Sequence, residues 1–147
     1  MSPYAEGAVP TANIGLRSIL NSIAPNARAD IEYSNFLLLD YDKIKDLVAK
    51  YWDSAYIDYG IDAPDFPLCY DFAELCAAKV REAAIRESFQ YRPAFGVVRH
   101  TRTDGKRHAI CFVVTSVLQI KYFEPQDRKS TRLNSSHHAI SRMPSSA

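Results

Sequence analysis

The sequence predicts an α+β fold in which one helix packs on an antiparallel β-meander. The first observation is an apolar stripe at helical spacing over residues 68–87. The second is a change of the apolar period to two over residues 94–101 and 107–115, which Asp104-Gly105 joins as a turn. The third is a further strand pattern over residues 118–124. The helical stripe consists of Cys69, Phe72, Ala73, Cys76, Val80 and Ala83.

The composition is that of one globular domain. The chain has 147 residues, 47% of them hydrophobic, which is enough for a substantial core. A formal net charge of +1 gives no electrostatic reason to expect a nucleic-acid or membrane partner. Three cysteines cannot all pair, so a disulfide scaffold is not expected. The N-terminus has no basic segment followed by an apolar one, so no signal peptide is expected.

Residues 127–147 differ from the rest of the chain. They contain six serines, no aromatic residue and no usable apolar period. Residues 127–137 and 141–147 are what one reading frame of the common Illumina-type sequencing adapter encodes. We therefore interpret residues 127–147 as a disordered, adapter-derived artefact and expect the natural chain to be truncated at Gln126. The remaining residues 1–126 carry 14 basic and 16 acidic side chains.

The part of the chain before the long helix is predicted to contain two further helices. Residues 1–35 form an N-terminal segment that is helical over 14–23, and residues 36–126 form the main domain, which begins with the short apolar run 36–39. Asp40 or Asp42 is suited to cap a second helix. That helix is predicted by Ile44, Leu47, Val48 and Tyr51, and the loop 56–67 follows it.

Cys69 stands at the predicted first turn of the long helix. The unpaired backbone N–H groups and the positive dipole end at a helix start favour a thiolate. A small core residue is the alternative interpretation of Cys69, and it is the one we adopt for Cys76, two turns further on.

His108 and Glu124 lie on neighbouring predicted strands with compatible parity. Ile110 shares the face of His108, and we expect this face to meet the helix. If His108 pairs with Glu124, the loop between the strands has an odd number of residues, 115–117, and Val114 faces Leu118. The other histidine, His100, lies between Arg99 and Arg102 and is expected to be exposed to solvent.

These three residues suit nucleophilic catalysis. An imidazole takes the proton of the thiol, and a carboxylate orients the imidazole and stabilises its charged form. The thiolate then attacks a carbonyl carbon. Cys69, His108 and Glu124 are therefore the candidate catalytic residues.

Three short blocks carry a resemblance to a known family: Cys69 to Ala73, His108-Ala109, and Phe123 to Gln126. In these blocks the chain resembles the papain-like cysteine-protease domain at the C-terminus of the Marasmius oreades agglutinin, and similar stand-alone domains of phage and metagenomic proteins. The resemblance implies a papain-like fold, a Cys–His–Glu triad at the three candidate positions, and a peptide or protein substrate. We expect the protein in the cytoplasm of a host cell or on a virion.

The resemblance also implies dependence on calcium. Asp71 matches an acidic position of the family's cysteine helix, and Asp62 and Asp65 are further candidates because Ca²⁺ prefers carboxylate oxygens. The chain departs from the family at Tyr70, where the family often has an acidic residue. The Gln or Asn that papain-like sites place upstream of the nucleophile is also not identified just before Cys69.

Three functions remain open at the level of sequence. The first is a thiol hydrolase, a peptidase or amidase that works through an acyl-enzyme. The second is a non-catalytic phage structural or interaction module on the same scaffold. The third is acyl transfer to an amine, as in transglutaminases. A zinc site is disfavoured because the cysteines and histidines lack finger-type spacing.

Overall fold

The computed structural model describes residues 2–28, 30–53 and 69–126, and these form an α+β fold with two antiparallel sheets. A short 3-10 helix η1 (Pro3–Ala5) is followed by strand β1 (Val9–Ala12) and helix α1 (Asn13–Ile23). Strand β2 (Asn35–Leu38), helix α2 (Tyr41–Val48) and the π-helical turn η2 (Ala49–Asp53) come next. Helix α4 (Cys69–Arg86) precedes strands β3 (Phe95–Thr101), β4 (Arg107–Val114) and β5 (Ile120–Phe123).

The helix and meander predicted from the sequence are confirmed. Strands β3, β4 and β5 form a three-stranded sheet in that order, and both neighbouring pairs are antiparallel. Strands β1 and β2 form a separate antiparallel pair. Isolated bridges from Leu37 to Pro93 and from Leu39 to Thr115 join β2 to the main sheet. Strand β1 was not predicted, because its side chains are mostly exposed and show no apolar alternation.

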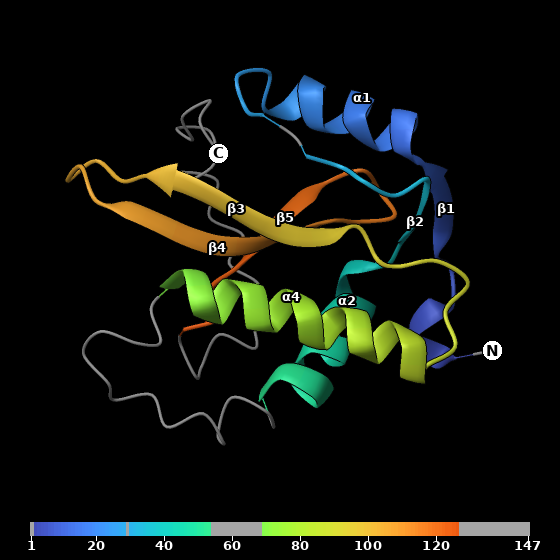
Figure 1. Cartoon of the computed structure of the whole chain (residues 1–147). Coiled ribbons are helices and arrows are strands. Elements are labelled where there is room, and N and C mark those ends of the chain that lie inside the picture. The colour runs from blue at the N-terminus through green and yellow to red at the C-terminus, as the bar shows by residue number, and fades with distance from the viewer. Residues whose placement is uncertain (1, 29, 54–68, 127–147) are drawn as a thin grey trace.

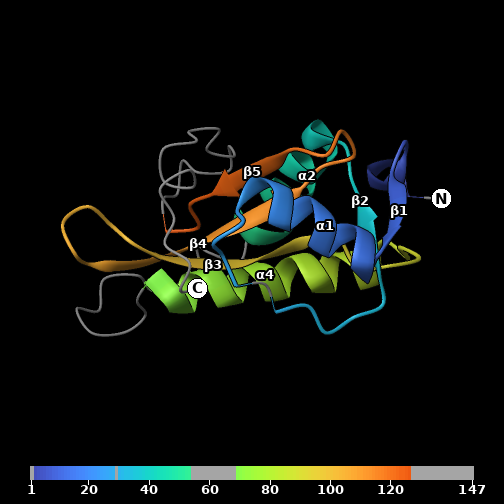
Figure 2. The same ribbon diagram turned by 90° about the horizontal axis from the view of Figure 1, so that it is seen from above.

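Helices cover both faces of the three-stranded sheet, with α4 on one side and α1 on the other (Figures 1 and 2). On the α4 side, Phe72 and Ala73 of the helix pack with Ala109 and Cys111 of β4. On the α1 side, Leu16 packs with Phe36, Leu38, Ala94 and Val114. Each face of β4 is therefore buried, which makes this strand the centre of the core.

The expected orientation of the β4 face is wrong. Helix α4 packs on the face of Ala109, Cys111 and Val113, and the Cys111 thiol donates to the Ala73 carbonyl at 3.3 Å. His108 and Ile110 alternate with these residues and so belong to the opposite face. Alternation alone does not identify the face that meets the helix, because both faces of β4 are apolar and buried.

The expected strand register is wrong by two residues, although its parity is right. Val114 pairs with Ile120 rather than with Leu118, so the connecting loop covers residues 115–119. This loop is longer than the predicted one but still odd-numbered. The two-residue periodicity of a strand therefore keeps the side chain of Glu124 on the face of His108.

Candidate functional site

Cys69 is the first residue of α4 in the described part of the chain, and it differs from the other two cysteines in exposure. Its side chain is partly exposed, whereas Cys76 and Cys111 are buried. Burial raises the pKa of the Cys76 thiol well above its ordinary value, with a smaller contribution from its hydrogen bond to Cys111. Of the three thiols, Cys69 is therefore the one that a reagent or substrate reaches most readily.

His108 and Glu124 form a direct hydrogen bond. His108 Nε2 lies 2.6 Å from Glu124 Oε2, and the two side chains are 20% and 30% exposed. His108 is the second residue of β4, and Glu124 directly follows β5. With Nε2 engaged by the carboxylate, Nδ1 is the ring nitrogen left to accept a proton.

A residue of η2 forms a hydrogen bond with the segment that carries Glu124. The Trp52 indole N–H donates to the carbonyl of Pro125 at 3.3 Å, and both side chains are almost completely buried. A buried indole normally finds such a partner, and here the partner is the residue after Glu124. The contact fixes the backbone on which the carboxylate stands.

A cavity of about 250 Å³ at this end of the sheet is lined by both Cys69 and His108, although His108 lies on the face of β4 that α4 does not cover. It lies between the start of α4 and the ends of β3 and β4. Within the described residues no hydrogen bond joins Cys69 to His108, and Glu124 reaches the cavity only through its bond to His108. The lining residues are Cys69, Tyr70, Arg99, His100, Thr101, Arg107, His108 and Ala109.

The expectation that His100 is exposed is wrong. Its side chain is only 8% exposed, and its ring stands edge-on to that of His108 with 5.5 Å between centroids. Burial lowers the pKa of His100, and the neighbouring His108 lowers it further. The missed signal lies in the hairpin: His100 and His108 are equally far from Asp104 in the turn, and they pair across β3 and β4.

The candidate calcium ligands do not form a site among the described residues. Asp62 and Asp65 lie outside them, and Asp71 stands in the first turn of α4. Where the structure describes the chain, no group of three or more His, Cys, Asp or Glu side chains is arranged to hold a metal ion. Because Asp62 and Asp65 lie outside the described residues, the dependence on calcium stays a prediction.

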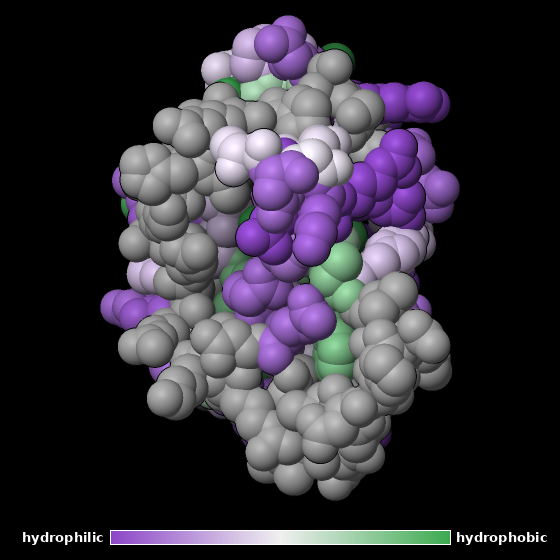
Figure 3. All heavy atoms as spheres, turned by 90° about the vertical axis from the view of Figure 1, so that its left-hand side faces the viewer, coloured by the Kyte–Doolittle hydropathy of each residue, from purple (hydrophilic) through white to green (hydrophobic). Residues whose placement is uncertain are grey.

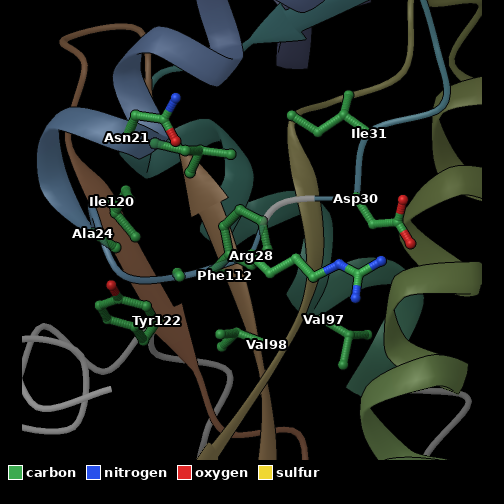
Figure 4. Close-up of a pocket in the computed structure, with 12 residues that line it drawn as sticks. Asn21, Ala24, Arg28, Asp30, Ile31, Val97, Val98, Phe112, Ile120 and Tyr122 are labelled. Carbon is green, nitrogen blue, oxygen red and sulfur yellow. The ribbon is translucent and has the colours of Figure 1, made fainter. Parts of the chain in front are cut away.

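A second cavity, of about 180 Å³, lies on the opposite face of the sheet (Figure 4). Asn21 of α1 and Ala24, which follows that helix, border it on one side, and Phe112, Ile120 and Tyr122 border it from the strands. Burial raises the pKa of the Tyr122 hydroxyl. None of the described residues that line this cavity is a cysteine or a histidine.

Within the described residues, no helix has the length and apolar character needed to cross a bilayer. No protein-family model and no curated protein matches this sequence.

Solved structures do resemble the fold. A structure described as the "PSL1a-E64 complex" matches with a TM-score of 0.62 and 19% identity, over 80% of this chain and 44% of that one. Polyporus squamosus lectin bound to a human-type influenza-binding epitope matches with a TM-score of 0.60 and 16% identity, over 86% of this chain and 48% of that one. This chain thus spans less than half of either structure. At these identities the likeness shows that it shares a fold with part of Polyporus squamosus lectin.

Proposed function

We propose that the protein is a thiol hydrolase of papain-like fold, a peptidase or amidase that uses Cys69, His108 and Glu124. The observation that carries the proposal is the 2.6 Å hydrogen bond between His108 and Glu124, beside a cavity that Cys69 also lines. A carboxylate at one ring nitrogen leaves the other free to act as a base, which is the arrangement that thiol activation requires.

The proposed reaction has two steps. In the first, His108 Nδ1 accepts the Cys69 proton, the sulfur attacks the substrate carbonyl, and the imidazolium returns the proton to the leaving amine. In the second, His108 accepts a proton from water and the resulting hydroxide attacks the acyl carbon; the C–S bond then breaks, the carboxylic acid leaves, and the imidazolium returns its proton to the Cys69 sulfur. Glu124 holds the ring orientation and stabilises its charged form in both steps.

The comparisons supply a suitable reagent. One of the structures of similar fold is described as a complex with E64. E-64 is an epoxide, and a thiolate opens an epoxide to form a stable thioether. A covalent adduct on this chain therefore reports an activated cysteine without knowledge of the substrate.

The first prediction concerns Cys69. We expect E-64 and iodoacetamide to modify Cys69 of the full 147-residue chain at neutral pH faster than they modify free cysteine, with the site identified by mass spectrometry. Cys69→Ala abolishes this labelling. Cys76→Ala is the matched control and leaves it intact, because Cys76 is buried. Glu124→Gln slows labelling, because the ring of His108 loses its orienting carboxylate.

The same experiment tests the other two functions, a non-catalytic module and acyl transfer to an amine. If Cys69 reacts no faster than free cysteine in a folded protein, the hydrolase proposal fails and a non-catalytic structural or interaction module remains. If Cys69 is reactive, adding an amine acceptor separates the two enzymes. Hydrolysis yields a carboxylic acid, and acyl transfer yields a new amide, which mass spectrometry distinguishes.

A further inference from the structure

The sheet end beside Cys69 presents two arginines on one face. Arg99 pairs with Ala109 and Thr101 pairs with Arg107 in the β3–β4 register. Residues two apart on a strand share a face of the sheet, and so do residues opposite each other on paired strands. These four side chains therefore lie on the same face of the β3–β4 hairpin. Ala109 packs against residues of α4, which identifies the face as the one that meets the helix. Arg99 and Arg107 are diagonal neighbours within this group.

An aromatic ring positions the first of these arginines. The Arg99 guanidinium carbon lies 3.9 Å from the centre of the Tyr70 ring, and Tyr70 directly follows Cys69. Stacking on a ring orders a guanidinium but leaves the N–H groups at its edge free to bind an anion. The Tyr70 that departs from the family pattern therefore has a physical role in this chain.

Among the described residues, no ion pair neutralises the positive charge of the two arginines at this site. In the described residues, no carboxylate forms an ion pair with Arg99 or Arg107, whereas Arg102 at the hairpin turn lies 3.7 Å from Asp104. None of the described residues that line the cavity is acidic. Residues 99–107 contain four basic side chains and one acidic side chain, although residues 1–126 are acidic overall. Figure 3 views this end of the molecule and shows hydrophilic side chains gathered across it.

The size of the cavity suits a single side chain. At about 250 Å³ it is below the roughly 300–1,000 Å³ of pockets that hold drug-sized ligands. Arginine matches the geometry of a carboxylate, which it binds through two parallel N–H groups. A Glu or Asp side chain of a peptide would thus place its carboxylate between the arginines and its backbone near Cys69.

We propose that this cavity is a specificity subsite for an acidic side chain next to the scissile bond, held by Arg99 and Arg107. The proposal rests on the hydrolase function proposed above and names the substrate class of that site. An acidic residue gains two charge-assisted contacts there, and a lysine or arginine at the same position is repelled.

The test compares two alkylating reagents of nearly equal size, anionic iodoacetate and neutral iodoacetamide. We expect the ratio of their rates at Cys69, iodoacetate over iodoacetamide, to exceed the ratio for free cysteine and to fall as salt is added. Arg99→Gln and Arg107→Gln should each lower this ratio by about 1.4- to 5-fold, the range for solvent-exposed charge pairs. His108 contributes equally in wild type and in these variants, so the change isolates the arginines.

Arg86→Gln is the matched control. It removes the same charge from the far end of α4, roughly 25 Å away at 1.5 Å per helical residue, and should leave the ratio unchanged. A second arm measures protection: the α-amide of N-acetylglutamate should slow labelling of Cys69 by iodoacetamide in wild type but not in Arg99→Gln. The corresponding glutamine compound should protect neither.

The outcomes separate the two proposals. If Cys69 reacts with both reagents no faster than free cysteine, the hydrolase function fails. If Cys69 is activated but its reagent ratio is the same in wild type, Arg99→Gln and Arg107→Gln, the hydrolase function stands and the acidic subsite is overturned. Equal protection by the glutamate and glutamine compounds also overturns the subsite.

Discussion

His108 has two different neighbours at the candidate site. Glu124 forms a hydrogen bond with Nε2 of His108. The buried ring of His100, on the paired strand, is nearly perpendicular to the His108 ring in a T-shaped contact. The sequence predicted the first contact through strand parity. It missed the second because a histidine between arginines has the pattern of an exposed residue, whereas the β3–β4 register sets His100 opposite His108, where it is buried.

The burial of His100 predicts a pH dependence of stability. Its pKa in the folded protein lies below the ordinary 6.5, so the unfolded chain binds a proton first as the pH falls. The stabilising contribution of neutral His100 is thus complete above pH 6.5 and is lost as the pH falls toward the lower folded pKa. Urea unfolding at pH 7.5 and 5.5 should show a smaller loss of stability in His100→Phe, which keeps a ring but takes no proton.

The comparison with His100→Phe is needed because another group acts in the opposite sense. Burial raises the pKa of Asp53 to about 6, so its protonation favours the folded state as the pH falls. Asp53 is present in both proteins, and its effect cancels in the difference. An identical pH dependence in wild type and His100→Phe would contradict the assignment to His100.

At the scale of elements, α4 carries a distinct feature at each end. It begins at Cys69, and at its other end Phe89 N–H donates to the Ala84 carbonyl at 2.9 Å while Ser88 N–H donates to the Ile85 carbonyl at 3.1 Å. These two bonds form a Schellman motif, in which the residue just after the helix adopts the left-handed backbone conformation. Ser88 takes that conformation with φ 58°, although glycine is the residue that usually occupies it.

Ser88→Gly is therefore expected to stabilise the protein. Glycine adopts a positive φ without the clash of a Cβ atom, and the relief is worth about 1 kcal/mol in the free energy of unfolding. Urea titration followed by circular dichroism measures the shift of the midpoint. Ser88→Ala keeps the Cβ atom and serves as the control. If Ser88→Ala raised the free energy of unfolding as much as Ser88→Gly does, the backbone strain at residue 88 would be refuted.

At the scale of the whole molecule, one carboxylate ties the N-terminus to the far end of α4. Glu87 accepts hydrogen bonds from Tyr51 Oη at 2.6 Å and Ser2 Oγ at 2.8 Å, and its Oε2 lies 3.3 Å from Lys50 Nζ. The hydrogen bond from Tyr51, followed by that from Ser2, holds the pKa of Glu87 below its usual value. Figure 1 shows η1 beside this end of the helix.

Glu87→Gln should lower the free energy of unfolding by about 1–2 kcal/mol at pH 7, because the acceptor of three donors loses its charge. The effect should shrink as the pH falls below 4.5, because the unfolded chain gains a proton at Glu87 first and the folded protein gains it only at the lower pKa of its hydrogen-bonded carboxylate. Glu82→Gln is the control on the exposed face of α4, where ion pairs with Lys79 and Arg86 contribute little. Equal losses in the two variants would show that Glu87 is not a tie between segments.

The sequence by itself determined the helix of α4, the β3–β4–β5 meander and the shared face of His108 and Glu124. These depend on periods of 3.6 and 2 residues, which are local properties of the chain. Only the tertiary structure decided the register at Ile120, the burial of His100 and the gathering of Arg99 and Arg107 beside Cys69. The physical reason is that β4 is apolar on both faces, so its pattern fixes which side chains lie together but not which helix covers them.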